Sequence, residues 1–220
     1  PGQIVPAWEV WDGSPPRKVG MVDRASLPVH PEASWPKRAL LGVGYFAVYT
    51  LMLMIGLVPI FPAFYVLYNL DYLIGGELDY SIAWSPLIFF TWPTAIILIL
   101  ASMAIVIALR WLIFPKRIKP GSYSIYSLFY FRKWSMALAT EVLLETLNSL
   151  FATIYMRYWY LMMGTKIGKG SELSTNLAGR YDLVEIGKGN FIGDEAIFGD
   201  EDVRSGYMRL DTVKTGDRVY

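Results

Sequence analysis

Side chains that could carry out chemistry are scarce in this 220-residue sequence, which has no cysteine and a single histidine, His30. These counts exclude disulfides, a cysteine nucleophile, thiolate metal sites and a metal centre built from several histidines. Two carboxylates one helical turn apart, Glu141 and Glu145, could form a general acid and base pair. They could also be the solvated side of a helix, because residues four apart share a helix face.

The composition indicates a membrane protein rather than a soluble domain. Hydrophobic residues make up 54% of the chain and charged residues 18%, and the mean hydropathy is +0.36. The formal charge is +1, from 20 Lys and Arg against 19 Asp and Glu, so no overall excess of charge would attract nucleic acid. Charge can therefore matter only by its position along the chain.

Two long uncharged stretches, residues 39–70 and 80–109, predict membrane-spanning helices. Each is longer than the roughly 20 residues that a spanning helix needs. We expect the first helix to break after Val58, where prolines follow, and the second to run from near Pro93 to Phe114. A buried helix of a soluble protein is the alternative interpretation of each stretch.

The charges that flank the two spans predict their orientation. The turn between the spans has acidic residues and no Lys or Arg, whereas basic residues precede the first span and follow the second. By the positive-inside rule, both termini face the cytoplasm. A nucleic-acid patch is the alternative, but basic residues directly after a span favour lipid headgroups. The residues expected at the membrane interface are Lys37, Arg38, Trp92, Arg110, Trp111, Lys116, Arg117, Lys119, Arg132, Lys133 and Trp134.

Residues 134–163 have the pattern of an amphipathic helix, or of two helices in series. Apolar residues recur at Met136, Leu143, Leu147 and Ile154, at the spacing of one helix face. Aromatic residues at both ends favour a position in the membrane interface. A core helix of the domain that follows is the alternative.

From Gly164 onward an aliphatic residue recurs at every sixth position, followed by glycine or a small polar residue. The segment that begins at Ile167 (Ile-Gly-Lys-Gly) is repeated at Ile186, and neither copy completes a phosphate-binding loop. This spacing is the hexapeptide signature of a parallel β-helix, with chance alternation in an ordinary sheet as the alternative. Residues 174–185 and 198–212 break the pattern and are expected to be loops. The predicted core residues are Ile167, Leu173, Ile186, Ile192, Val213 and Val219.

The predicted fold class is membrane α plus β-solenoid: two transmembrane helices, an interfacial amphipathic helix and the first coils of a left-handed parallel β-helix. An integral membrane protein with the β-helix on the cytoplasmic side is expected. Because an uncapped coil exposes a sheet edge, we expect further coils or a partner surface over residues 213–220. The predicted parts are a proline-rich cytosolic linker at 1–36, a two-span hairpin at 37–115, a basic connector with the amphipathic helix at 116–163, and the incomplete β-helix at 164–220.

Two motifs, Phe-Ala-Thr-Ile-Tyr at 151–155 and the segment 164–175, follow the spans and the basic connector. In this order the chain resembles the membrane-embedded terminal region of the ε-poly-lysine synthetase family of nonribosomal peptide synthetases. The resemblance covers about residues 36–220 and is strongest from Phe129 to Gly199. In that family, adenylation and carrier domains precede three pairs of transmembrane helices, each followed by an acetyltransferase-like β-helix domain.

The resemblance implies partners and a substrate for this chain. The partners would be the lipid bilayer and the adenylation domain, carrier domain and further transmembrane and β-helix units of the same polypeptide. The acyl donor would be tethered to the carrier by phosphopantetheine, with no cofactor bound directly. The chain has neither an adenylation signature nor a carrier serine motif, so by itself it would be inactive. Hexapeptide acyltransferases commonly use a histidine base, but His30 lies in the linker. Either the base lies downstream of Tyr220, or this domain is structural, or it uses another group such as Asp182, Glu185, Asp194 or Glu195.

Three functions are compatible with these patterns. The first is a membrane-anchored, amide-forming acyl-transfer segment of a nonribosomal peptide synthetase that makes an amino-acid homopolymer or short peptide. The second is a membrane-bound hexapeptide acyltransferase that uses acyl-CoA. The third is a non-catalytic structural subunit of a membrane complex.

Overall fold

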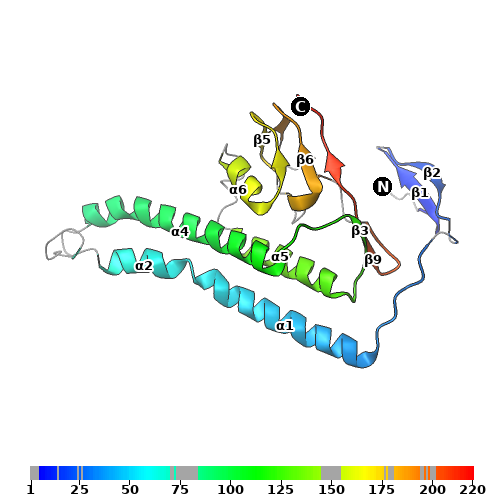
Figure 1. Cartoon of the computed structure of the whole chain (residues 1–220), viewed down its shortest axis with the longest axis horizontal. Helices are drawn as coiled ribbons and strands as arrows, with labels where there is room; N and C mark the ends of the chain where they lie inside the picture. The colour runs from blue at the N-terminus through cyan, green and yellow to red at the C-terminus, as the bar shows by residue number, and fades with distance from the viewer. Residues whose placement is uncertain are drawn as a thin grey trace.

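The computed structural model describes residues 5–13, 15–23, 25, 27–69, 72, 84–144, 155–175, 177, 181–193, 196, 198 and 202–220. Near the N-terminus, strands β1 (Glu9–Asp12) and β2 (Arg17–Met21) form an antiparallel hairpin (Figure 1). The Lys18 Nζ atom lies 2.5 Å from Glu9 Oε1, and the Trp11 indole donates to Glu9 Oε2. The segment predicted as a linker therefore contains a small ordered hairpin.

Three apolar helices form the long arm of the molecule in Figure 1: α1 (Trp35–Leu57), α2 (Ile60–Tyr68) and α4 (Trp84–Ile113). The break between α1 and α2 falls after Val58, as predicted, because Pro59 and Pro62 supply no N–H to the α1 hydrogen-bond ladder. The expected start of the second helix near Pro93 was wrong. Helix α4 begins nine residues earlier and continues through this proline, which apolar helices tolerate when turns on both sides keep their bonds.

The segments Trp35–Tyr68 and Thr91–Ile113 are long and apolar enough to cross a membrane. Only 17% of the most apolar window of each segment is buried, whereas the core helix of a soluble protein would be mostly buried. The exposed apolar surface supports a membrane location.

Helix α5 (Leu128–Leu144) packs along α1 and α4. It runs parallel to α1, since Phe131 lies beside Gly44 and Val142 lies beside Gly56, where an added β-carbon would be 3.0 Å from the valine. Helix α6 (Met156–Met163) follows and buries Trp159 and three other side chains. Within the described residues the amphipathic pattern yields two helices; Met136 and Leu143 of α5 are buried, whereas Tyr158 and Leu161 of α6 are exposed.

At the end of the described chain, short parallel strands lie side by side in three successive layers. Strands β4 (Lys166–Ile167), β6 (Val184–Ile186) and β10 (Val213–Lys214) form one parallel sheet in the order β10-β6-β4, and β5 (Glu172–Leu173) pairs in parallel with β7 (Phe191–Ile192). We call residues 166–175 rung 1, residues 184–193 rung 2 and residues 213–220 rung 3. The described strands do not close into complete coils, so the β-helix stays a proposal that this stacking supports.

A second, antiparallel sheet stands beside the rungs. Strands β8 (Asp202–Arg204) and β9 (Tyr207–Leu210) form a hairpin that pairs with β3 (Gly121–Ser124) in the order β3-β9-β8. Ser205 and Gly206 both have positive φ at the hairpin turn, as a two-residue turn of this hand requires. The segment between rungs 2 and 3 thus ties the rungs to the connector after α4.

One continuous core joins the membrane helices to the rungs. It contains Val106 of α4, Phe114 directly after α4, Met136 of α5, Trp159 of α6 and Ile186 of rung 2. The last turns of α4 therefore belong to the protein interior, whereas the earlier turns of this helix present Trp92, Ile96 and Leu100 on the surface.

Candidate functional site at the junction of the membrane helices and the rungs

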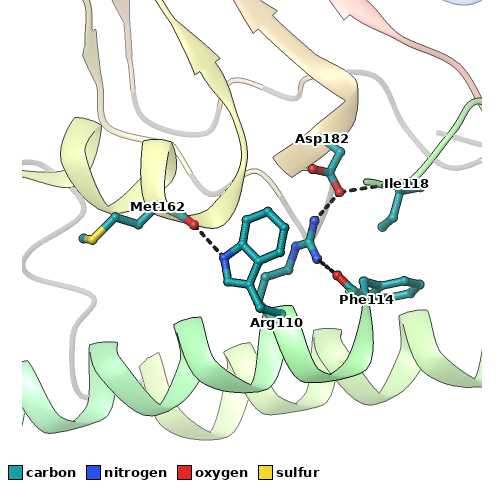
Figure 2. Close-up of polar contacts among 6 residues, drawn as sticks. Arg110, Phe114, Ile118, Met162 and Asp182 are labelled. Carbon is teal, nitrogen blue, oxygen red and sulfur yellow. Dashed lines mark hydrogen bonds and ion pairs between the residues drawn. The ribbon is translucent and has the colours of Figure 1, made fainter. Parts of the chain in front are cut away.

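The buried face of α4 brings a charge into the core. Ser102, Val106 and Arg110 are spaced four apart, so they share one face of α4, and Phe114, directly after the helix, continues this spacing. All four are buried. Arg110 is only 1% exposed. Its predicted place among lipid headgroups is therefore wrong, because the guanidinium points into the protein, toward the turn that carries Asp182 (Figure 2).

Arg110 connects three elements through charge-assisted hydrogen bonds. Its Nη2 donates to Asp182 Oδ2, in the 3₁₀ turn Tyr181–Leu183 before β6, and its Nη1 donates to the Phe114 carbonyl at 2.7 Å. The backbone N–H of Ile118 donates to the same Asp182 oxygen at 3.0 Å. Next to it, the Trp111 indole donates to the Met162 carbonyl of α6 at 2.9 Å. These bonds fix the end of α4 against the beginning of the rungs (Figure 2).

Gly164, directly after α6, lies against the Asp182 carboxylate. Its φ of 112° is in the left-handed region, which favours glycine. A β-carbon there would lie 2.6 Å from Asp182 Oδ1. Oδ1 is buried and has no hydrogen-bond partner among the described residues. The Asp182 side chain is fully buried, so its carboxylate is not exposed to solvent.

Two buried phenols lie on one side of this ion pair: Tyr181, next to Asp182 in the chain, and Tyr160, whose ring is 6.2 Å from the Tyr181 ring. Burial raises the pKa of Tyr181 to about 12, although the Thr140 side chain and the Arg110 charge oppose the shift. Burial also raises the pKa of Tyr160, whose hydroxyl donates to the Thr175 carbonyl at 2.6 Å. Both phenols stay neutral at physiological pH; Tyr160 is a hydrogen-bond donor, and Tyr181 is a packing group of the core.

Glu185 lies in a ladder of charges across the rungs. Its Oε1 is 2.6 Å from Lys166 Nζ of rung 1, and its Oε2 is 2.8 Å from Lys214 Nζ of rung 3. Hydrogen bonds from these two lysines lower the pKa of Glu185 to about 2. A carboxylate of such low basicity is a poor proton acceptor, so the contacts of Glu185 favour a structural role.

Replacing Glu185 with glutamine is expected to lower stability slightly at neutral pH, because this surface ladder is partly screened by water. The folded pKa of Glu185 lies below its ordinary value of 4.5, so its stabilising effect is present above about pH 4.5 and is lost as the pH falls toward 2. Unfolding temperatures of both proteins should differ at neutral pH and converge near pH 2. A difference that persists at pH 2 would show that the charge ladder is not its cause.

Buried polar side chains connect the rungs at one corner, and sequence reasoning missed them. Ser171 Oγ donates to the Gly187 carbonyl, and the Asn190 N–H donates to Ser171 Oγ. Asn190 Nδ2 then donates to Thr215 Oγ1 at 2.9 Å and to the Gly216 carbonyl at 2.8 Å. A signal was present, since Ser171 and Asn190 follow the same Gly-Lys-Gly sequence in the two repeats.

The predicted core positions differ in burial. Ile167, Leu173, Ile186 and Ile192 are buried. Ile167 lies opposite Ile186, and Leu173 lies opposite Ile192. Val213 is half-buried, and Val219 is 40% exposed in rung 3, which no described residue covers on its outer side. Asp194 and Glu195 lie outside the described residues.

Most of the predicted interface residues are on the surface. Trp92 is 75% exposed and Trp111 is 38% exposed, while Trp134 is half-buried against Tyr45. Lys133 is 7% exposed, so its predicted contact with lipid headgroups is also wrong; it lies on the side of α5 that faces protein. Among the predicted interface residues, the exposed basic ones are Lys37, Arg38, Lys116, Arg117, Lys119 and Arg132.

The described part of the chain contains no cluster of three or more His, Asp or Glu that could hold a metal ion. His30 is exposed, and its ring lies 6.5 Å from the Tyr126 ring, far along the chain from the rungs. The hydrogen bonds of Arg110, Asp182 and Trp111 hold two parts of the molecule in a fixed relation: helices of membrane length and a stack of parallel rungs.

Helices long and apolar enough to cross a membrane are fixed here to a stack of parallel rungs, which supports a membrane location for this chain. The chain is 33% identical over 224 residues to the Delta-poly-L-ornithine synthetase of Acinetobacter baumannii (strain AB307-0294). The alignment covers 99% of this chain and 16% of that synthetase, so the chain corresponds to a small part of it. No family model matches the chain, and no solved structure matches it. The similarity confirms the predicted relationship to poly-amino-acid synthetases.

Proposed function

We propose that this chain is the membrane-anchored acyl-transfer segment of a nonribosomal peptide synthetase that builds an amino-acid homopolymer or a short peptide. The observation that carries the proposal is the similarity to Delta-poly-L-ornithine synthetase, which extends over 99% of this chain. Because that similarity covers 16% of the relative, activation of the amino acid is assigned to other parts of the polypeptide. The helices Trp35–Tyr68 and Thr91–Ile113 would supply the anchor.

The proposed reaction is attack of an amine on a thioester. A C–N bond forms, the C–S bond breaks, the thiol leaves, and the proton of the amine passes to the departing sulfur or to a base. The donor is a substrate, an aminoacyl group on the phosphopantetheine arm of a carrier domain. The alternative donor, acyl-CoA, has the same thioester chemistry. Holding both reactants in a fixed geometry can supply much of the rate of such a reaction.

The described carboxylates favour positioning over proton transfer. Asp182 is buried in its pair with Arg110, and Glu185 is held between two lysines. If a base is used, we propose that it comes from Asp194, Glu195 or another part of the polypeptide. The same contacts favour a second function, a non-catalytic scaffold that holds catalytic parts at the cytoplasmic face of the membrane. The exposed Lys116, Arg117 and Lys119 after α4 support this sidedness.

Trp111→Ala in the natural polypeptide tests the positioning role, since it removes the bond from α4 to the Met162 carbonyl. Product formation should fall on the order of ten- to hundredfold, because small displacements of bound reactants are costly. Amino-acid-dependent ATP–pyrophosphate exchange should remain unchanged. Residues 1–220 alone should show no such exchange.

Trp92→Ala is the matched control, because it removes the same side chain from the exposed, distant part of α4. It should leave both activities nearly unchanged. Equal product formation by the two variants would contradict a positioning role for the junction. Exchange by residues 1–220 alone would contradict the proposed division of labour.

A further inference from the structure

Two lysines stand at the same turn of rungs 1 and 2. Lys169 and Lys188 are the middle residues of the repeated Gly-Lys-Gly, and both are exposed. The Gly189 N–H donates to the Lys169 carbonyl at 3.1 Å, so the two turns lie directly against each other. Because neighbouring strands are about 4.8 Å apart, two equal charges lie side by side here, and like charges opposite each other destabilise a sheet. We call residues 168–170, 187–189 and 216–218 the basic corner.

The repulsion at the basic corner is not relieved by a neighbouring carboxylate. In the charge ladder on the same rungs, Glu185 lies between two lysines and contacts both. The corresponding acidic residue of the basic corner is Asp217, but its Oδ1 accepts the main-chain N–H of Lys188 at 2.7 Å. Among the described residues, the ammonium groups of Lys169 and Lys188 have no ion-pair partner. Their charges are therefore free to meet an anionic ligand.

The third cation of the basic corner, Arg218, has an unusual backbone conformation. It stands in rung 3 where the other rungs have Gly170 and Gly189, whose φ values are 73° and 63°. Arg218 has a φ of 58°, a conformation that glycine adopts freely and a residue with a β-carbon adopts only under strain. Its side chain extends over rung 2, since its Cγ lies 3.7 Å from the place of a β-carbon on Gly189. Backbone strain of this kind is concentrated at binding sites.

Three cations on adjacent turns fit a phosphate group. A guanidinium binds phosphate oxygens through two parallel hydrogen bonds, and ammonium groups add point charges beside it. The binding would come from side chains, because the Gly-Lys-Gly segments do not complete a phosphate-binding loop and the Lys188 N–H is already bonded. Both thioester donors considered for this chain carry phosphate at the base of the pantetheine arm, as a phosphodiester on a carrier domain or as the pyrophosphate of CoA.

We propose that Lys169, Lys188 and Arg218 bind the phosphate at the base of the pantetheine arm of the thioester donor. The choice of this ligand rests on the proposed function, whereas the affinity for an anion rests on the basic corner alone. No bond forms or breaks at the corner, so the three residues position the donor and are not catalytic residues. Holding the arm by its charged end leaves the thioester end free to meet the acceptor amine.

Lys169→Ala combined with Lys188→Ala in the natural polypeptide tests the proposal. The unchanged protein in detergent should bind free 4′-phosphopantetheine on the order of tenfold more tightly than pantetheine, which lacks the phosphate. The double variant should bind the two compounds equally, and its unfolding temperature should not fall, because a repulsion has been removed. Lys166→Ala combined with Lys214→Ala is the matched control, since it removes the same charge from the same stack of rungs and should keep the preference for phosphopantetheine.

Equal binding of the two compounds by the unchanged protein would overturn the proposal, and so would a preference that survives in the double variant. Glycerol 3-phosphate carries the phosphate of a lipid headgroup without the pantetheine arm. If it binds as tightly as phosphopantetheine and depends on the same lysines, the basic corner serves lipid and not the donor. Failure of the proposed function is a separate result, because it would appear as a natural polypeptide that makes no peptide product, whether or not the corner binds phosphate.

Discussion

Asp182→Ala is expected to destabilise the protein by about 3–5 kcal/mol, because it leaves the buried Arg110 guanidinium without its carboxylate. The side chains of both residues are at most 1% exposed, so water cannot replace the lost partner. The Ile118 N–H loses its acceptor as well. In the natural polypeptide solubilised in detergent, the unfolding temperature should fall by roughly 10 °C.

Two further variants test whether the loss of stability comes from an unpaired buried charge or from the removal of any carboxylate. Asp211→Ala breaks an ion pair with Arg209 in which both side chains are at least 66% exposed, and it should cost less than about 1 kcal/mol. Arg110→Met combined with Asp182→Leu replaces both charges by apolar groups and should recover most of the stability. If Asp182→Ala costs no more than Asp211→Ala, the pair does not hold the junction together.

Local patterns in the sequence predicted the parts of this fold that depend on neighbouring residues. The uncharged stretches predicted the helices because a span needs only continuous apolar length. The repeated Ile-Gly-Lys-Gly places Ile167 and Ile186 at corresponding positions of two repeats, and these two residues lie opposite each other in the parallel pair of β4 and β6. The kink after Val58 followed from proline chemistry.

The junction could not be predicted in the same way, because its partners are far apart in the sequence. Arg110 and Asp182 are 72 residues apart in the sequence. Each of them, taken alone, is a type of residue that is usually exposed on the protein surface. Arg110 ends an apolar span, where basic residues usually meet headgroups. Only the packing of the 3₁₀ turn Tyr181–Leu183 over α4 turns it into a buried partner. The same limit explains Lys133, whose burial depends on which face of α5 meets protein.

Gly168→Ala is expected to have the second large effect, a loss of at least about 3 kcal/mol, because the stacking of rungs 1 and 2 leaves no room for a β-carbon. The added carbon would lie 2.4 Å from the Gly187 oxygen, 2.5 Å from its carbonyl carbon and 2.6 Å from the Lys188 nitrogen. All three are main-chain atoms, so no side chain can turn aside to relieve the clash. The two rungs would have to separate.

Separation of these rungs would also break the Gly168 N–H bond to Ile186 O and weaken the contact of Lys166 with Glu185. Thermal unfolding of Gly168→Ala beside Gly193→Ala measures the effect, with the second variant controlling for the general cost of replacing glycine in this region. Because the clash would separate rungs 1 and 2, the backbone amide hydrogens of residues 166–175 should exchange with solvent faster in Gly168→Ala than in the unchanged protein. Equal stability of the two variants would mean that rungs 1 and 2 do not lie against each other at Gly168, and the parallel stacking on which the β-helix proposal depends would be wrong.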